Sequence, residues 1–557
     1  MRKLLFILAW GASVALAADG PDALETTRQF VSSGAPQLAL MRIEQLQPRD
    51  AAVPLWGEWE KLRLNLLFRF KRHEEVLDRV AALPGNFSLP AQREALKLAV
   101  RSAVASGKGA QARHYAARLL WQTGAAADDL GEIRLLVIDS LVADRQGDDA
   151  FRSMLRFQQD YQPLERTVAA RFVDALLELG MAREAVNWLG SLDEADPLKL
   201  LLRLATGLVP ADAATAQARA RLAKNHDAGY WRVLAQAAVQ QKNRALQIEA
   251  LENTLQLAAA EHAQRRTAQQ LWQVYFAVAQ EFASQNQLPT ANDSGWLDRA
   301  ARLRTTQPFV SRSLLADLAV RGQMRETRHH AQLQLIAFLR SDKRERVALR
   351  LFRHADLEID ALDSEGRYLL GGIAESHDLP AEALRYWQGL NAPRDVGAAA
   401  WQLRIAAIAV RAAMPEHAAT AIRNAIAAAK TLPAELAQRS VTLVQGILDA
   451  GRIELARELF EALLPQLNTA QQRIVLFALG RIHENAGRLA AAADHHLRSA
   501  LLADGRDALA LQARLAAALD LARAGYKEDA RAQFEWLLRN SKDAAQLEIA
   551  RRELKKL

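Results

Sequence analysis

The stretch that decides the fold is residues 451–460, GRIELARELF, because the same arrangement returns as GRLAAAADHH at 487–496 and GYKEDARAQF at 525–534. Each stretch begins with glycine, carries alanine five residues later, and places a large side chain four residues after that alanine. Side chains four residues apart lie on one face of a helix, one turn apart. The pattern therefore predicts a repeated pair of antiparallel helices joined by a tight turn.

The same period extends upstream through weaker breaks. Breaks at Asp342, Asp378 and Met414 precede Gly451, so that successive spacings from 342 to 525 are 36, 36, 37, 36 and 38 residues. The small residue lets the second helix approach the first, and the larger residue fills the groove between neighbouring repeats. The predicted small/large pairs are Val347/Leu351, Ala383/Trp387, Ala419/Arg423, Ala456/Phe460, Ala492/His496 and Ala530/Phe534.

These landmarks resemble the tetratricopeptide repeat (TPR) family, whose helix pairs use Leu-Gly in the first helix and Ala-x-x-x-Phe in the second. The best matches are Leu479-Gly480 with Ala492, Ala456 with Phe460, and Gly525 with Ala530 and Phe534. Arg423 and His496 depart from the aromatic of the family, and the repeat-ending proline is only approximated, at Pro393, Pro433 and Pro465. The resemblance covers about residues 328–557 and implies an all-α, right-handed superhelical solenoid.

The N-terminal half shows the same period less clearly. Breaks at Lys71, Gly107 and Gly180 are one and then two periods apart, with an imperfect turn near Gln146-Gly147. The loop-like segment Ser284–Trp296 is the predicted boundary between two blocks, and a single continuous superhelix is the alternative. We expect a degenerate helical-repeat block over residues 18–300 and a TPR-like solenoid over 301–557 that ends in a polar capping helix.

Composition and the N-terminus predict an exported protein. The 557 residues are 50% hydrophobic and 24% charged with a net charge of +8, and the absence of cysteine excludes thiol nucleophiles, cysteine-ligated metals and disulfides. Arg2 and Lys3 precede an apolar stretch, Leu4–Leu16, and Ala15-Leu16-Ala17 fits a cleavage site. We therefore expect a signal peptide over residues 1–17, a periplasmic mature protein of net charge +6 that does not span the membrane, and no nucleic-acid partner.

Local patterns that would carry catalysis are missing from the sequence. It contains no H-E-x-x-H, G-x-S-x-G or G-x-x-x-x-G-K-[ST] motif, and Ser106-Gly107-Lys108-Gly109 is expected to form a helix–helix turn. We expect no catalytic residue, cofactor or metal site. His483 is placed to meet His495 across a helix pair, but core positions for His483 and His496 are favoured. The basic stretch Arg340–Arg353 is expected to be an amphipathic helix with a solvated basic face.

The TPR resemblance implies that first helices line a groove that receives an extended peptide or a partner helix. Arginine and amide side chains beside aromatics suit carboxylates and peptide backbones, since guanidinium groups pair with carboxylates bidentately. The expected groove residues are Tyr368, Trp401, Arg404, Arg411, Gln438, Gln445, Arg481 and Glu484.

Three functions are compatible with these features. The favoured function is a non-catalytic scaffold that binds protein partners in a cell-envelope assembly, with anionic polysaccharide or peptidoglycan as the alternative partner. A second function is cell-wall lysis, because the chain resembles the superhelical domain of soluble lytic transglycosylases and Glu375-Ser376 resembles their catalytic pair. A third function is an accessory role in exopolysaccharide export or outer-membrane assembly.

Overall fold

The computed structural model describes residues 20–33, 36–85, 87–122, 127–286, 293–355, 361–502 and 506–557. The predicted signal peptide, residues 1–17, lies outside these ranges. The chain divides into two compact units, Met1–Ala250 and Leu251–Leu557. The predicted limits of the two repeat blocks, at residues 300 and 301, stay predictions.

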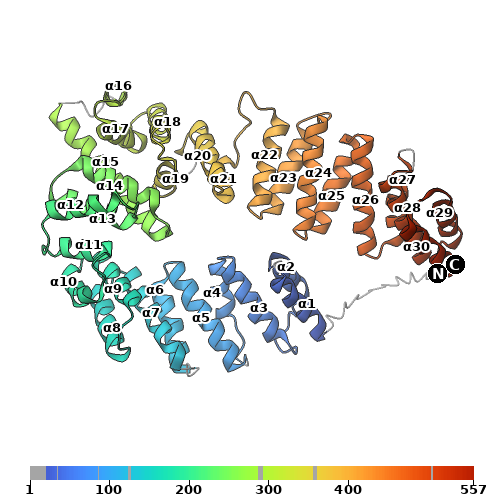
Figure 1. Cartoon of the computed structure of the whole chain (residues 1–557), viewed down its shortest axis with the longest axis horizontal. Helices are drawn as coiled ribbons and strands as arrows, with labels where there is room; N and C mark the ends of the chain where they lie inside the picture. Colours follow the sequence, from blue (N-terminus) through green and yellow to red (C-terminus); the bar gives the residue numbers. More distant parts are fainter. Residues whose placement is uncertain are drawn as a thin grey trace, which may run out of the picture. The chain divides into compact units, whose positions relative to one another are not determined.

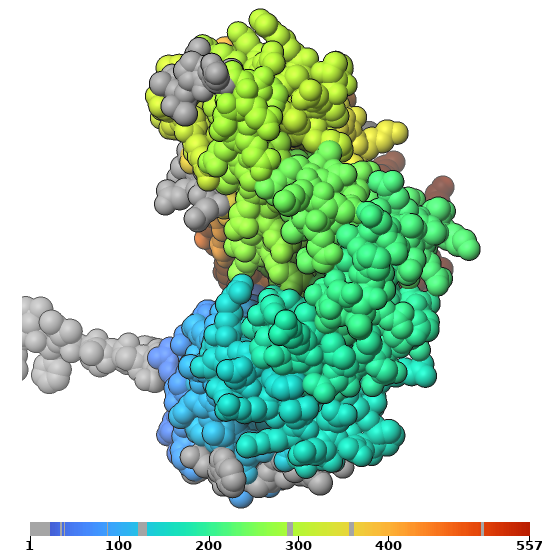
Figure 2. All heavy atoms as spheres, turned by 90° about the vertical axis from the view of Figure 1, so that its left-hand side faces the viewer, coloured from blue at the N-terminus to red at the C-terminus, as the bar shows by residue number. Residues whose placement is uncertain are grey.

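The first unit consists of successive helices, each packed against its neighbours in sequence (Figure 1). The space-filling view of Figure 2 shows one face of the first unit, coloured blue to green, as a closely packed surface. Its helices are α1 Gly20–Ser32, α2 Pro36–Leu46, α3 Trp56–Arg69, α4 His73–Ala81, α5 Leu89–Ala105, α6 Gly109–Gln122, α7 Ala127–Ala143, α8 Gly147–Asp160, α9 Arg166–Glu178, α10 Ala182–Ala185, η1 Val186–Ser191, α11 Pro197–Ala205, α12 Ala211–Leu222 and α13 Ala228–Gln240; α14, Arg244–Leu257, contains the division between the units.

The second unit begins within α14, includes the long helix α15 and continues as regular helix pairs (Figure 1). Its helices are α15 Glu261–Gln285, α16 Asp293–Leu303, α17 Pro308–Arg321, α18 Arg325–Ser341, α19 Glu345–Arg353, α20 Ser364–Ser376, α21 Pro380–Trp387, α22 Ala398–Arg411, α23 Pro415–Ala427, α24 Ala434–Asp449, α25 Ile453–Leu463, η3 Leu464–Gln466, α26 Thr469–Asn485, α27 Leu489–Leu501, α28 Ala508–Arg523, α29 Lys527–Asn540 and α30 Ala544–Leu554. No strand occurs among the residues that the structure describes. The predicted all-α solenoid of helix pairs is confirmed, while its superhelical handedness stays a prediction.

The six helix pairs from α18–α19 to α28–α29 each turn at a residue in the left-handed backbone region, which supplies the physical basis of the repeat. At Gly487 (φ 72°) the amide of Arg488 donates to the carbonyl oxygen of His483 at 2.9 Å, which closes a Schellman motif and satisfies a carbonyl at the end of α26. Glycine adopts this conformation without steric cost, whereas other residues pay for it. The turn residues of the second unit are Lys343, Asp378, Ala413, Gly451, Gly487 and Gly525.

The predicted small/large pairs form the core of the repeats, with one exception. Ala383, Ala456, Ala492 and Ala530 are fully buried, as are the large residues that follow them. Arg423 is instead 49% exposed and pairs with Glu458.

This exception arises because the turn before α23 lies one residue earlier than predicted. The preceding turn lies at Ala413 rather than at Met414, so that the buried pair is Ala418 and Ile422, one residue earlier than predicted. The placement of Arg423 at a core position was therefore wrong.

The Leu-Gly dipeptides provide room for the largest of these side chains. A Cβ built on Gly371 of α20 would lie 2.7 Å from Cε2 of Trp387 and closer still to its pyrrole edge. A Cβ on Gly480 of α26 would lie 2.8 Å from Cγ of His496. His496 thus occupies the position that Trp387 occupies three repeats earlier, which confirms the expected core position of His496.

Candidate functional site

The predicted groove residues lie on first helices α20, α22, α24 and α26 of the second unit. Helix α22 contacts α24, and α24 contacts α26, so that these first helices form a continuous layer. The layer is the candidate partner-binding surface, and its residues fall into three groups according to their contacts.

The aromatic group belongs to the core. Trp401 is fully buried, and its indole N–H donates to the carbonyl oxygen of Leu390 at 3.1 Å. Tyr368 is half-buried and stacks on Trp387, with ring centroids 6.2 Å apart. The assignment of Trp401 to an exposed groove wall was therefore wrong, because tryptophan is the large residue that fills the space beside Trp387.

A second group ties one repeat to the next. Arg404 pairs with Glu375 of the preceding first helix and also covers the Trp387 ring at 4.6 Å. Arg411 pairs with Asp378 at 2.5 Å, and Glu484 pairs with Arg523 of α28 at 2.9 Å. These ion pairs hold consecutive first helices in register, so that Arg404 has a structural partner in addition to any external ligand.

The third group points into solvent. Gln438, Gln445 and Arg481 are exposed. Gln445 donates to Asp449 of its own helix at 2.8 Å, and the Gln438 side-chain oxygen accepts from Gln471 at 3.4 Å. Arg481 extends from α26 without a polar partner among the residues that the structure describes. Arg411, exposed despite its ion pair, completes this set, which can receive carboxylate and backbone groups.

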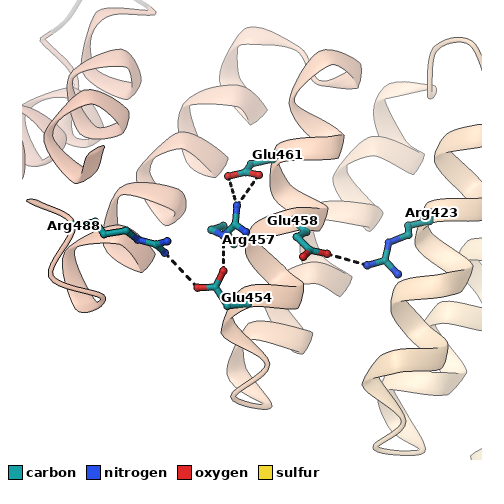
Figure 3. Close-up of polar contacts among 6 residues, drawn as sticks. All are labelled: Arg423, Glu454, Arg457, Glu458, Glu461 and Arg488. Carbon is teal, nitrogen blue, oxygen red and sulfur yellow. Dashed lines mark hydrogen bonds and ion pairs between the residues drawn. The ribbon is translucent and has the colours of Figure 1, made fainter. Parts of the chain in front are cut away.

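The second helices carry a network of ion pairs that was not predicted from the sequence. On α25 the guanidinium of Arg457 bridges Glu454 and Glu461, at 2.7 Å to each (Figure 3). The hydrogen bond from Arg457 lowers the pKa of Glu454, and the two glutamates raise the pKa of Arg457. The i, i+3 and i, i+4 spacing of these residues is the sequence pattern that could have revealed the network.

This network also joins neighbouring repeats. Arg423 of α23 reaches Glu458 at 3.2 Å, and Arg488, before α27, reaches Glu454 at 3.3 Å (Figure 3). The carboxylates of α25 therefore have cationic partners within the chain. Such pairs at exposed sites contribute about 0–1 kcal/mol each, so that the network orders the repeats rather than dominating their stability.

The histidines lie in the repeat core. His483 stacks on His495 across α26 and α27, with centroids 5.0 Å apart, as the sequence indicated. The buried His496 contacts the buried Asp520 through Nδ1 at 3.0 Å. Burial lowers the pKa values of His483 and His495. Within the described ranges, no group of three or more His, Cys, Asp or Glu residues is arranged to hold a metal ion.

The basic stretch Arg340–Arg353 is only partly solvated. Arg344 reaches the fully buried Glu252 at 2.9 Å, and Arg350 donates to the carbonyl oxygens of Leu255 and Gln256 at the end of α14. Arg353 pairs with Glu382 and with Glu261. The expectation of a wholly solvated basic face was wrong, because these three arginines satisfy groups inside the second unit.

Glu252 is the centre of a buried polar cluster that the sequence did not indicate. Arg312, only 2% exposed, binds Glu252 at 2.9 Å and Asp342 at 2.6 Å, and the Tyr275 hydroxyl donates to Glu252 at 2.6 Å. Together with Arg344, the cluster has two acidic and two basic groups. Its residues span positions 252 to 344 of the sequence, and no local motif links them.

Two further sequence-based expectations concern a turn and a membrane. Gly107 forms the helix–helix turn expected for Ser106–Gly109, and Lys108 in that turn pairs with Glu74. No helix in the described part of the chain combines the length and apolar character needed to cross a membrane.

Comparison with known proteins gives no family assignment. No protein-family model matches the chain, and no curated protein matches it significantly. Among solved structures, the chain is similar to "Crystal structure of APC/C hetero-tetramer Cut9-Hcn1", at 10% identity and a TM-score of 0.27, over 96% of this chain and 97% of that one. It is also similar to "Structure of Naa15/Naa10 bound to HypK-THB", at 12% identity and a TM-score of 0.19, over 96% of each chain. Because both TM-scores lie below 0.5, the fold assignment rests on the helix pairs of this chain itself.

Proposed function

We propose that this chain is a non-catalytic scaffold that binds an extended segment of a protein partner along the first helices α22, α24 and α26. The observation that carries this proposal is the row of exposed polar side chains on these contacting helices: Arg411, Gln438, Gln445 and Arg481. A row that advances by one helix per repeat matches an extended chain better than a compact ligand. Preorganised polar groups bind with less entropic cost than mobile ones.

The ion pairs between repeats support this proposal because they fix the first helices relative to one another. Arg404 with Glu375, and Glu484 with Arg523, span successive first helices. The exposed guanidinium groups favour partner carboxylates, and the exposed amides can pair with a peptide backbone. An acidic extended peptide is therefore the preferred partner, and an anionic polysaccharide is the alternative.

We further propose that this scaffold acts in the periplasm, as part of a cell-envelope assembly. The support is the leader-like N-terminus, in which Arg2 and Lys3 precede Leu4–Leu16. Fractionation of cells that produce the full chain, followed by intact-mass measurement, tests the location. A periplasmic product shortened by residues 1–17 is expected, and a full-length cytoplasmic product would contradict the proposal.

Cross-linking in cells, followed by mass spectrometry, tests the binding surface. We expect the full chain to recover defined envelope proteins, and the double variant Arg411→Glu/Arg481→Glu to lose them. The matched control is Lys430→Glu, which reverses an exposed charge outside the proposed surface and should leave recovery unchanged. Equal recovery by the double variant and the Lys430→Glu control, or no recovery above background by the wild-type chain, would contradict the proposal.

The lytic alternative has a direct test in a peptidoglycan zymogram. Glu375 is engaged by Arg404 of the next repeat, a contact that serves the solenoid itself. We expect no clearing by the wild-type chain. Clearing by the wild type that is lost in Glu375→Gln would replace the scaffold proposal with an enzymatic one.

A further inference from the structure

A cavity of about 450 Å³ opens between η3, α26 and the end of α27. Its walls are aliphatic and consist of Leu464, Pro465, Leu476, Leu501 and Leu502. Leu501 is 62% exposed, the highest value among the large hydrophobic residues that the structure describes. Removing aliphatic surface from water lowers the free energy of the system. A ligand that covers these cavity walls is therefore stabilised.

The polar lining of this cavity is one arginine and one glutamine. Arg498 lies one helical turn before Leu501 and Leu502, so that its side chain and theirs share one face of α27. Its acidic neighbour is Asp494, 3.7 Å away and 63% exposed, and this loose pairing leaves most guanidinium donors available. No acidic residue lines the cavity.

Gln472 holds the wall in place. Its side-chain amide donates to the carbonyl oxygens of Leu467 and Leu464, at 3.0 and 3.3 Å, and so fastens η3 to α26. Because these two bonds use the amide nitrogen, Arg498 is the main donor that remains for a ligand. The cavity therefore offers one cationic anchor beside a purely aliphatic wall.

We propose that this cavity binds a single-chain aliphatic carboxylate of the fatty-acid type, with its carboxylate on Arg498 and its alkyl chain against Leu501 and Leu464. An alkyl chain has no polar group to satisfy, whereas a peptide would bring backbone N–H and C=O groups to a wall that offers them few partners. The positive charge of Arg498 distinguishes an anion from a neutral alcohol or an amine of equal length. This inference is independent of the proposed scaffold function, because the cavity lies outside the first-helix row.

Titration of the full chain with sodium decanoate below its micelle concentration, followed by calorimetry, tests the proposal. We expect saturable one-site binding that Arg498→Gln weakens about tenfold or more, with 1-decanol and decylamine weaker than decanoate on the wild-type chain. The matched control Arg439→Gln removes an exposed arginine of α24 and should leave decanoate binding unchanged.

Hydrogen exchange and a wall variant locate the ligand. Decanoate should slow amide exchange in η3 and the last turn of α27, and Leu501→Ser should weaken binding while the circular dichroism spectrum stays that of the wild type. The proposal is overturned if decanoate does not bind, if Arg498→Gln and Arg439→Gln bind it equally, or if an amidated leucine peptide binds more tightly than decanoate.

Discussion

Gly371 and Gly372 are adjacent on helix α20 but have different surroundings. A substitution at Gly372 therefore serves as the control for the same substitution at Gly371 in a test of the repeat packing. Gly371 faces the indole of Trp387, whereas a Cβ on Gly372 would meet nothing within 4 Å. Both lie in the helix interior, where alanine is favoured over glycine by about 1 kcal/mol. The difference between Gly371→Ala and Gly372→Ala therefore isolates the steric cost of the new methyl group.

The structure sets the size of that cost. The new Cβ would lie 2.7 Å from Cε2 of Trp387 and closer still to Nε1 and Cδ1, whereas carbon atoms in good contact lie about 3.5–4.0 Å apart, so that the ring must move by more than about 1 Å. Trp387 is fully buried, donates to the carbonyl oxygen of Tyr368 at 3.1 Å, and packs on Trp401 at 5.1 Å between centroids. Overpacking at such sites costs about 1–3 kcal/mol.

We therefore expect Gly372→Ala to stabilise the α20–α21 pair by up to about 1 kcal/mol, and Gly371→Ala to be about 3 kcal/mol less stable than Gly372→Ala. Urea unfolding of a repeat array is not reliably two-state. Hydrogen exchange of the α20 and α21 amides measures the local opening free energy instead.

A double variant tests the assigned cause. In Gly371→Ala/Trp387→Leu the smaller side chain leaves room for the methyl group, so that the combined loss should be smaller than the sum of the two single losses by 1 kcal/mol or more. Equal protection of α20 in Gly371→Ala and Gly372→Ala would refute the assignment of Gly371 as the space-providing residue.

Three further predictions concern a turn, the buried charge cluster and a buried histidine. Ala413 has φ 56°, so Ala413→Gly should stabilise the α22–α23 pair by about 1 kcal/mol in the same exchange measurement, and a loss of protection would contradict the strain argument. Glu252→Ala leaves Arg312 and Arg344 without their buried partner and should lower the opening free energy of the α15 and α17 amides, measured by hydrogen exchange, by about 3–5 kcal/mol, while the exposed control Glu435→Ala should change little. Burial, with the charges of Arg353 and Arg265, lowers the pKa of His354 from its ordinary value to about 4. The unfolded chain therefore binds more protons between pH 6.5 and 4, and stability should fall as the pH falls through this window. A melting temperature that depends equally on pH in His354→Asn would contradict this role.

Much of the repeat architecture was predictable because each landmark is local. A glycine that reverses the chain, an alanine five residues later and a large residue one turn beyond are set by helix geometry and turn stereochemistry within about ten residues. This is why Gly451, Gly487 and Gly525 were located correctly, while Ala413, a residue without a preference for the left-handed region, displaced the predicted frame by one position.

The candidate binding surface was less predictable, since helix periodicity does not say which neighbour a side chain meets. Trp401 and Arg411 lie on the same helix, yet the first fills a space beside Trp387 and the second reaches Asp378 at the surface. Arg404 was expected to face a ligand, and the sequence did not indicate that it also pairs with Glu375 of the previous repeat.

By itself the sequence determined the helix-pair period, the turns at Gly451, Gly487 and Gly525 and the small/large packing rule, because these depend on backbone stereochemistry over short distances. Only the tertiary structure decided which charged side chains form ion pairs with other residues of the same chain. Glu252, Arg312 and Arg344 meet from separate helices, and the aliphatic cavity beside Arg498 exists only where the ends of successive second helices come together. Burial and ion pairing depend on contacts between distant segments, and no local pattern encodes them.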